Sequence, residues 1–353
     1  MSHYEERLER DLAKIRKRIQ RMGAAVVDAV RSATQCALTH DEELATETIL
    51  GDLPINRQSR ELDHRCHIFI ARHLPSAGHL RYISSAMRLS KTLERVGDYA
   101  ETMSRAALQL SMAPTESVAK DIEMMGRHAS NILEQSLEAY TEGSVEKARA
   151  TKAVVGQYGT TFDKVFSDVL KVGTEGSQPM EDLFSLMAIF NRLERILHQG
   201  KNVCEQTIFA VTGEGKEEKT FDVLFVDSRN AGASLFAEYF CRKAYHGTGS
   251  FESAGWDVAE GADDAFIEFA DSRGLDLRDA EPRSFDDVVG QIADYDLVID
   301  LVGGVRKHLT RIPFHTMILS WPIEDRTDPE AVYKQLAPRI SDLMELLRGE
   351  DED

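Results

Sequence analysis

Apolar residues recur at helical spacing through roughly the first 210 residues of the chain. In the first segment they alternate steps of three and four, as in the seam of a helical bundle: Leu8, Leu12, Ile15, Ile19, Met22, Val26 and Val30. A second helix is predicted to start at Asp41, with Pro54 kinking or restarting it. A third is predicted to open near residues 74–76, because proline suits a first turn.

This helical pattern repeats at an offset of 100 residues. The segment SAMRLSKTLERV at 85–96 matches SLMAIFNRLERI at 185–196, and serine, methionine, leucine, glutamate and arginine coincide. Such a repeat indicates an internal duplication. It predicts two three-helix bundles side by side, one over residues 1–110 and one over 111–211.

The pattern changes after residue 211. Residues 212–220, TGEGKEEKT, combine glycine with charge and predict a linker. Beyond them, the strand-like runs FDVLFV, FESAGW, YDLVIDLV and HTMILSW alternate with amphipathic helices, the last over 329–347. This alternation predicts a parallel sheet in a three-layer α/β domain over 221–348, followed by an acidic tail at 349–353.

Composition narrows the class of protein. With 42% hydrophobic and 29% charged residues the chain resembles a globular protein, and its formal charge of −18 argues against nucleic acid as a partner. Four scattered cysteines without a C-x-x-C pair indicate neither a zinc knuckle nor a disulfide framework. The charged N-terminus is unlike a signal peptide, and no apolar run approaches a membrane span. A cytoplasmic protein is expected.

Residues 223–238, VLFVDSRNAGASLFAE, read as a strand, a loop and the start of a helix. They resemble the phosphate-binding loop of the low-molecular-weight protein tyrosine phosphatases and related arsenate reductases, because Asn230 and Ser234 match that loop. Asp227 stands where that family has its nucleophilic cysteine, and Ala233 where it has its phosphate-binding arginine. Arg229 replaces a glycine of the family pattern.

These replacements remove the two groups that the phosphatase reaction requires. The reaction needs a thiolate stabilised by backbone N–H groups, together with an arginine that holds the phosphate oxygens. A carboxylate at residue 227 would repel a phosphate dianion. An aspartyl-phosphate mechanism would need a magnesium site, and no D-x-D pattern follows Asp227. We therefore expect an inactive domain with a degenerate loop: Asp227, Ser228, Arg229, Asn230, Ala231, Gly232, Ala233 and Ser234.

Two roles for this loop stay open at the level of sequence. Asp227 could occupy the backbone N–H groups itself and make the loop rigid. Alternatively, the loop could bind an inorganic anion, or Arg229 could point outward to a partner protein. By the same resemblance, Asp325 or Asp328 occupies the position of the general acid. The competing interpretation, which we favour, is a cap of the last helix, since T-D-P-E is a helix-start signal.

The third predicted helix carries a row of carboxylates. Glu94, Asp98 and Glu101 occupy i, i+4 and i+7, opposite the apolar stripe, and the second repeat offers Glu194 and His198. Carboxylates, with or without imidazole, are ligands for iron, manganese or zinc. The alternative is a solvated helix face that is partly neutralised by neighbouring arginines.

Three segments, INRQSRELDHRC, IARHLPSAGHLR and LERVGDYAE, resemble the PhoU family of phosphate-signalling proteins over residues 5–210. The resemblance implies two symmetric three-helix bundles and metal binding through E-x-x-x-D pairs, of which Glu94 and Asp98 are intact. His79 and His198 stand where the family usually has aspartate, and residues 199–200 interrupt its pattern. The family restrains the high-affinity phosphate transporter and its partner histidine kinase when phosphate is plentiful.

We therefore expect a regulator of phosphate uptake and phosphate-responsive signalling. It would bind a transporter ATPase or a sensor histidine kinase, and its exposed bundle faces suggest a homodimer. Whether the sensed anion is phosphate or arsenate stays open. One alternative is an arsenate reductase or phosphatase that uses a relocated thiol, with Cys241 as the nearest, although a buried core cysteine is the competing interpretation. Another is a metal-storage or metal-responsive module.

Overall fold

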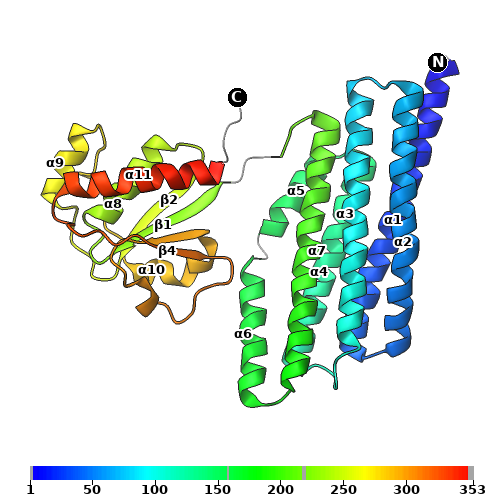
Figure 1. Cartoon of the computed structure of the whole chain (residues 1–353), viewed down its shortest axis with the longest axis horizontal. Helices are drawn as coiled ribbons and strands as arrows, with labels where there is room; N and C mark the ends of the chain where they lie inside the picture. Colours follow the sequence, from blue (N-terminus) through cyan, green and yellow to red (C-terminus); the bar gives the residue numbers. More distant parts are fainter. Residues whose placement is uncertain (1–2, 157–158, 217–219, 349–353) are drawn as a thin grey trace. The chain divides into compact units, whose positions relative to one another are not determined.

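The protein folds into two compact units, Met1–Lys216 and Glu217–Asp353, in a computed structural model (Figure 1). The structure describes residues 3–156, 159–216 and 220–348. The predicted acidic tail at 349–353 and residues 217–219 of the predicted linker lie outside the described residues. The two units are described separately below.

The first repeat consists of three long helices. They are α1 (His3–Thr39), α2 (Glu42–His73) and α3 (Ala77–Ala107) (Figure 1). Asp41 caps α2, because its side chain accepts a hydrogen bond of 2.9 Å from the Leu44 N–H. Pro54 lies inside α2, which continues through it, and the left-handed Leu74 (φ 43°) ends the helix.

In its described residues, 111–156 and 159–211, the second repeat contains four helices where the sequence predicts three. They are α4 (Glu116–Glu142), α5 (Val145–Gly156), α6 (Gly159–Glu175) and α7 (Met180–Thr212) (Figure 1). By position in the repeat, α4 corresponds to α1 and α7 to α3. The middle helix of the first repeat, α2, therefore corresponds to two shorter helices. Gly143 ends α4 in the left-handed conformation (φ 66°) that glycine adopts without strain.

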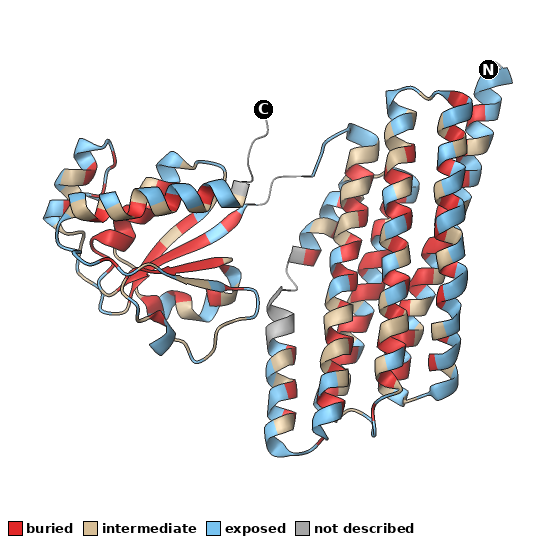
Figure 2. Ribbon diagram, viewed as in Figure 1, coloured by how far each residue is buried: buried red, intermediate tan, exposed pale blue. Residues whose placement is uncertain are grey.

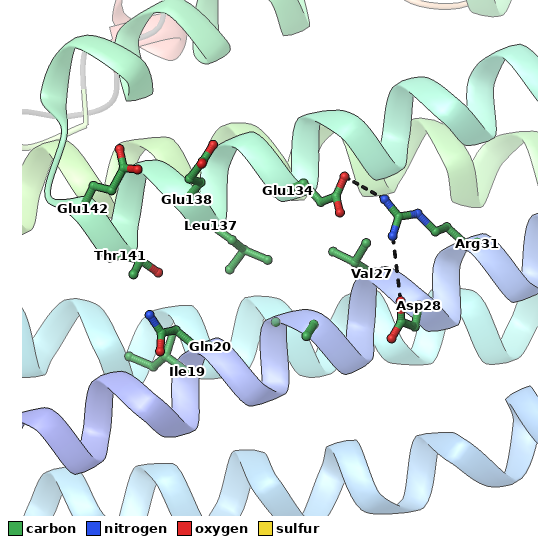
Figure 3. A pocket seen from close by; sticks show the side chains of 12 residues that line it. Ile19, Gln20, Val27, Asp28, Arg31, Glu134, Leu137, Glu138, Thr141 and Glu142 are labelled. Atoms are coloured by element: carbon green, nitrogen blue, oxygen red, sulfur yellow. Dashed lines mark ion pairs between the residues drawn. The ribbon is translucent and has the colours of Figure 1, made fainter.

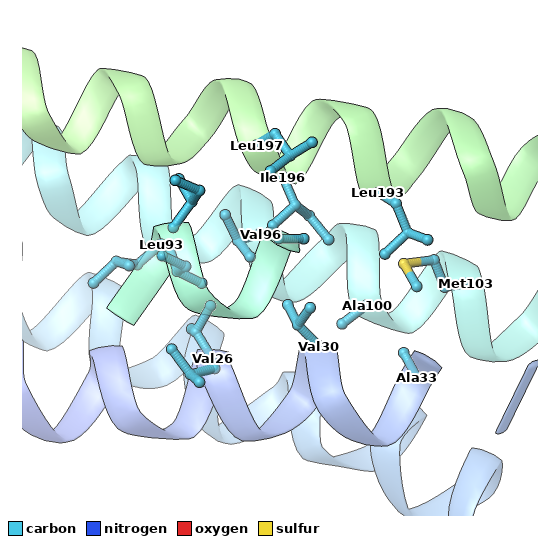
Figure 4. Close-up of a cluster of buried hydrophobic side chains, with 14 of the residues drawn as sticks. Val26, Val30, Ala33, Leu93, Val96, Ala100, Met103, Leu193, Ile196 and Leu197 are labelled. Atoms are coloured by element: carbon cyan, nitrogen blue, oxygen red, sulfur yellow. The ribbon is translucent and has the colours of Figure 1, made fainter. Parts of the chain in front are cut away.

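One continuous hydrophobic core runs through both repeats. All seven residues of the predicted seam in α1 are buried. Leu93 and Val96 of α3 and their offset partners Leu193 and Ile196 of α7 are fully buried, and Figure 4 shows them beside Val30 of α1. Each such side chain contributes roughly 1.5–3 kcal/mol when it leaves water. The two repeats therefore share one core instead of folding around separate ones.

The second unit is built on a four-stranded sheet. Its strands are β1 (Phe221–Asp227), β2 (Gly249–Gly255), β3 (Leu297–Asp300) and β4 (Met317–Ser320). They are parallel and lie in the order β2-β1-β3-β4. Since Val226 of β1 pairs with Asp300 of β3, both strands end at the same edge of the sheet.

Helices cover both faces of this sheet, as predicted. Along β1, Val223 and Phe225 pack into one cluster, while Leu224 and Val226 pack into another. The first cluster is formed with α8 (Ala233–Ala244), α9 (Asp264–Ser272) and α11 (Pro329–Arg348). The second is formed with α10 (Phe285–Val288), η1 (Val289–Asp294) and η2 (Val305–Lys307). Both clusters are seen as buried positions beside the strands in Figure 2.

Within the part of the chain that the structure describes, no helix is both long enough and apolar enough to cross a membrane.

Candidate functional site

The degenerate loop, residues 227–234, joins the end of β1 to the start of α8. Asp227 is 5% exposed, and its carboxylate turns back onto the loop backbone. Its Oδ1 accepts hydrogen bonds from the N–H groups of Arg229 (3.0 Å) and Asn230 (2.6 Å), and its Oδ2 accepts one from the N–H of Ser234 (2.9 Å). The side chain therefore fills the concave side of its own loop.

This arrangement bears on whether the loop binds an inorganic anion, and it leaves the outward role of Arg229 as a prediction. Backbone N–H groups at the start of a helix bind anions because they carry positive partial charge and point at the ligand. The three N–H groups named above already have a carboxylate as their partner. An inorganic anion would have to displace a covalently attached carboxylate and tolerate its charge. The first interpretation, in which Asp227 occupies the loop internally, is the one that the structure contains.

Asn230 locks the loop to its surroundings. It is fully buried in the left-handed conformation (φ 49°), which asparagine tolerates better than most residues. Its Nδ2 donates to Ser234 Oγ (3.0 Å) and Ser253 Oγ (2.8 Å), and its Oδ1 accepts from the Arg283 N–H (2.6 Å). The residues shared with the phosphatase pattern are thus occupied in holding the loop together.

The network continues into α8. Ser253 donates to Glu238 Oε2 (2.5 Å), and Arg242 forms an ion pair with Glu238 Oε1 (2.8 Å). Burial raises the pKa of the Glu238 carboxyl, while the bonds from Ser253 and Arg242 oppose that effect. Gly255 lies against the loop so closely that a Cβ there would come within 2.7 Å of the Asn230 nitrogen. The loop has little room to open.

The remaining loop residues are also engaged. The carbonyls of Ser228 and Ala231 accept from the N–H groups of Asp257 (2.7 Å) and Asp263 (2.8 Å). Gly232 lies against Phe266, and Ala233, in the arginine's position, is buried. The Arg229 side chain is 58% exposed and lies 3.4 Å from the Asp263 carboxylate. Of the loop side chains, Arg229 is the one that reaches outward.

A second filled loop lies beside the first, and the sequence reasoning missed it. Asp300 ends β3, is 3% exposed, and accepts from the N–H groups of Val302 (3.1 Å), Gly303 (2.8 Å) and Val305 (2.9 Å). Asp300, like Asp227, is the last residue of a buried strand. The adjacent strands β1 and β3 therefore both end in an aspartate whose carboxylate accepts hydrogen bonds from the N–H groups of the following loop.

The two aspartates proposed for the general acid lie at turns. The Asp328 carboxylate accepts from the Glu330 N–H (3.0 Å) at the start of α11, as a helix cap does. Asp325 accepts from both the N–H and the hydroxyl of Thr327, and these hydrogen bonds lower the pKa of Asp325. A general acid needs the opposite shift, so the geometry fits the capping interpretation.

The nearest thiol in sequence does not replace the missing nucleophile. Cys241 lies on α8 with no exposed surface, in the cluster that packs against the sheet. Burial raises the pKa of its thiol far above the usual range, so the reactive thiolate is disfavoured. The alternative enzyme with a relocated nucleophile finds no support at Cys241.

The carboxylate row of α3 is joined by Asp52 of α2, a residue that sequence reasoning also missed. Asp52 is 7% exposed, and its Oδ1 has no hydrogen-bond partner. Burial, followed by the negative charges of Asp98, Glu101 and Glu94, raises the pKa of Asp52 to about 6. Periodicity along α3 could not reveal this neighbour on another helix.

The predicted metal ligands do not form a closed set. Glu94 accepts from Ser59 Oγ (2.8 Å) and Lys91 Nζ (2.8 Å), and in the second repeat His198 Nε2 lies 4.0 Å from Glu194 Oε1. Across the described ranges, no three His, Cys, Asp or Glu side chains are arranged to hold a metal ion. Metal binding at Glu94, Asp98, Glu194 and His198 stays a prediction, and no step of the function is derived from it.

Comparison with known proteins places the helical unit. The family model described as PhoU domain matches twice, at residues 19–107 and 122–207. The phosphate-specific transport system accessory protein PhoU homolog of Clostridium acetobutylicum is 27% identical over 207 residues, covering 58% of this chain and 94% of that protein. PhoU of Escherichia coli K12 is 25% identical over 212 residues, covering 60% and 88%.

Solved structures add two neighbours. The crystal structure of PhoU from Pseudomonas aeruginosa superposes with a TM-score of 0.53 at 25% identity, over 58% of this chain and 99% of that chain. The tyrosine phosphatase Wzb from Escherichia coli K30 aligns with a TM-score of 0.31 at 24% identity, over 36% and 99%.

We expect Asp227→Asn to destabilise the α/β unit. Asparagine keeps the shape but turns one acceptor into a donor that faces a backbone N–H, so the unfolding free energy should fall by about 1–3 kcal/mol. Both tryptophans, Trp256 and Trp321, lie in this unit, so fluorescence during chemical denaturation of the full chain reports on it alone. The exposed Asp342→Asn is the matched control, and an equal effect of the two would contradict this role of Asp227.

We expect Asp52→Asn to stabilise the helical unit at neutral pH by about 1–2 kcal/mol, because it removes a buried charge among like charges. The folded pKa of about 6 lies above the ordinary value of 3.8, so the wild type should lose stability as the pH rises from about 4 to about 6. The variant's advantage should therefore vanish below about pH 4. Circular dichroism during denaturation at several pH values measures this. A variant that is less stable at neutral pH would contradict this expectation.

Proposed function

We propose, from the premise that the helical unit is a tandem of two PhoU domains, that this protein is an accessory regulator of phosphate transport. The single observation that carries the proposal is the pair of domain matches, which fill the helical unit at the repeat spacing found in the sequence. Relatives named as accessory proteins of the phosphate-specific transport system support it.

The regulator would act by binding a component of the transport system, either the transporter ATPase or a sensor histidine kinase. Such a role needs stable surfaces and no reaction centre. The shared core of α1, α3, α4 and α7 supplies a rigid scaffold, and long exposed helix faces surround it. These features support a protein that works through docking.

The α/β unit would serve this regulator as a binding module without turnover. Asp227 and Asp300 satisfy the loops at which a phosphate ester would be expected to bind, and Cys241 is buried. Because the N–H donors of these loops are already bonded within the domain, it can contact a partner through its surface but offers no reactive group.

The first test is affinity capture of the tagged full chain from phosphate-replete cells after the membranes are solubilised. We expect enrichment of a phosphate-transporter ATPase or a sensor kinase over a tag-only control, measured by mass spectrometry. A second capture with the tag at the other end guards against a masked surface. If neither protein is enriched with either tag, the proposed regulatory role is wrong.

A second test addresses catalysis directly. The purified full chain should hydrolyse an aryl phosphate no faster than buffer, and Asp227→Ala should behave in the same way. The physical reason is that the loop's N–H donors are occupied and no thiolate faces them. Hydrolysis by the wild type that is lost in Asp227→Ala would show that the α/β unit is an enzyme.

A further inference from the structure

A groove lined by positive side chains runs between α1 and α2 of the helical unit. It encloses a cavity of about 480 Å³. The cations that line it are Lys14, Lys17, Arg18, Arg21, Arg65 and Arg72, and its lining includes one carboxylate, Asp11. A concentration of positive charge of this kind stands out in a chain with a net charge of −18.

Four of these cations have partners inside the protein. Asp11 pairs with Lys14 (2.9 Å) and Arg72 (3.2 Å). The hydrogen bond from Lys14, helped by those from His73 and Arg72, holds the pKa of Asp11 at about 2 against the effect of burial. Asp11 therefore stays ionised and anchors one end of the groove.

Glu61 likewise forms ion pairs with Arg18 (2.8 Å) and Arg65 (3.7 Å). Lys17 and Arg21 are exposed and form no ion pair within the described part of the chain. Even when Asp11 and Glu61 are both counted, positive charge is in excess along the groove. Neutralisation of nearby carboxylates therefore does not account for Lys17 and Arg21.

The groove is not purely polar. Ile68 lines it as a half-buried apolar side chain, above Ile15 and Phe69, which are each 2% exposed and belong to the core. Cations and an apolar side chain in the same groove suit a ligand that carries both carboxylates and apolar side chains. A bare inorganic polyanion would gain nothing from the apolar side chain that lines the groove.

The other side of α1 has the opposite character. Figure 3 shows the groove between α1 and α4, where Glu134, Glu138 and Glu142 follow one edge. Arg31 is held there by Glu134 (2.7 Å) and Asp28 (3.8 Å). Both grooves are recessed, so the acidic groove of one copy does not fit into the basic groove of another. A protruding acidic element is required.

We propose that the α1–α2 groove binds an acidic amphipathic helix of a partner protein. A helix fits a channel between two helices, and its glutamates at i, i+3 and i+4 would follow the cations, which are spaced at the same intervals along α1. Arginine forks bind carboxylates in a bidentate manner, and a leucine of the same helix would cover the half-buried Ile68. This inference goes beyond the proposed function and does not depend on it.

The test uses the full chain and a fluorescein-labelled peptide of about 15 residues, which spans ~22 Å as a helix. Its glutamates flank a leucine stripe, and a second peptide has the same composition with the stripe scrambled. We expect Lys17→Glu/Arg21→Glu to weaken binding of the striped peptide about tenfold or more in fluorescence anisotropy. Arg306→Glu/Lys307→Glu is the matched control, because it makes the same charge change at exposed residues of the α/β unit, and it should have less than about a twofold effect.

Each other outcome overturns the proposal. Equal weakening by both variants would mean a long-range effect of net charge, and equal binding of the scrambled peptide would mean unspecific attraction. If inorganic polyphosphate, or vesicles of phosphatidylglycerol and phosphatidylcholine, bind through Lys17 and Arg21 while the striped peptide does not, the groove is a polyanion or membrane site. If the wild type self-associates in light scattering and the groove variant is monomeric, a second copy occupies the groove.

Discussion

The helical unit depends on the burial of one apolar seam that both repeats share. Leu93 and Val96 occupy the same core as their offset partners Leu193 and Ile196, so neither repeat can bury its own seam alone. This constraint fixes α1, α3, α4 and α7 as the inner helices. The repeats differ in their flanking helices, α2 in one repeat and α5 and α6 in the other.

The α/β unit depends on a different constraint, which is that charge placed at the end of a buried strand must find partners. Asp227 and Asp300 solve this problem in the same way, by accepting three backbone N–H groups each. The solution gives a rigid sheet edge and uses up the donors that an anion would need. Stability of the loop and binding of a phosphate ester are therefore in direct competition at this edge.

Local patterns in the sequence predicted the fold well, because its elements follow from periodicity. The helical periodicity, the cap at Asp41 and the strand runs depend on near neighbours in the chain, and the structure contains that cap and those strands. The sequence showed that Asp227 takes the place of the nucleophilic cysteine. It did not show whether the carboxylate bonds to its own backbone, because a carboxylate can face its own backbone or a partner.

What the sequence could not reveal depends on contacts between distant segments. Asp52 acquires its raised pKa from carboxylates on α3, and it lies more than forty residues before them in the chain. The groove between α1 and α2 likewise arises only when the helices pack. The basic residues of α1 can be seen in the sequence. The groove that they line also needs Arg65 and Arg72 of α2, which only the packed helices bring to it.

A comparison of the charges in the two units indicates where recognition can occur. In the degenerate loop the buried Asp227 carboxylate accepts hydrogen bonds from the loop's own N–H groups, and Arg229 lies beside Asp263. In the α1–α2 groove, Asp11 and Glu61 are each shared between cations, and Lys17 and Arg21 are left to solvent. Free energy from a new ion pair is available only where a charge is not already satisfied and where apolar surface lies close enough to be buried with it. On that criterion the α1–α2 groove suits a charged partner better than the inside of the degenerate loop does.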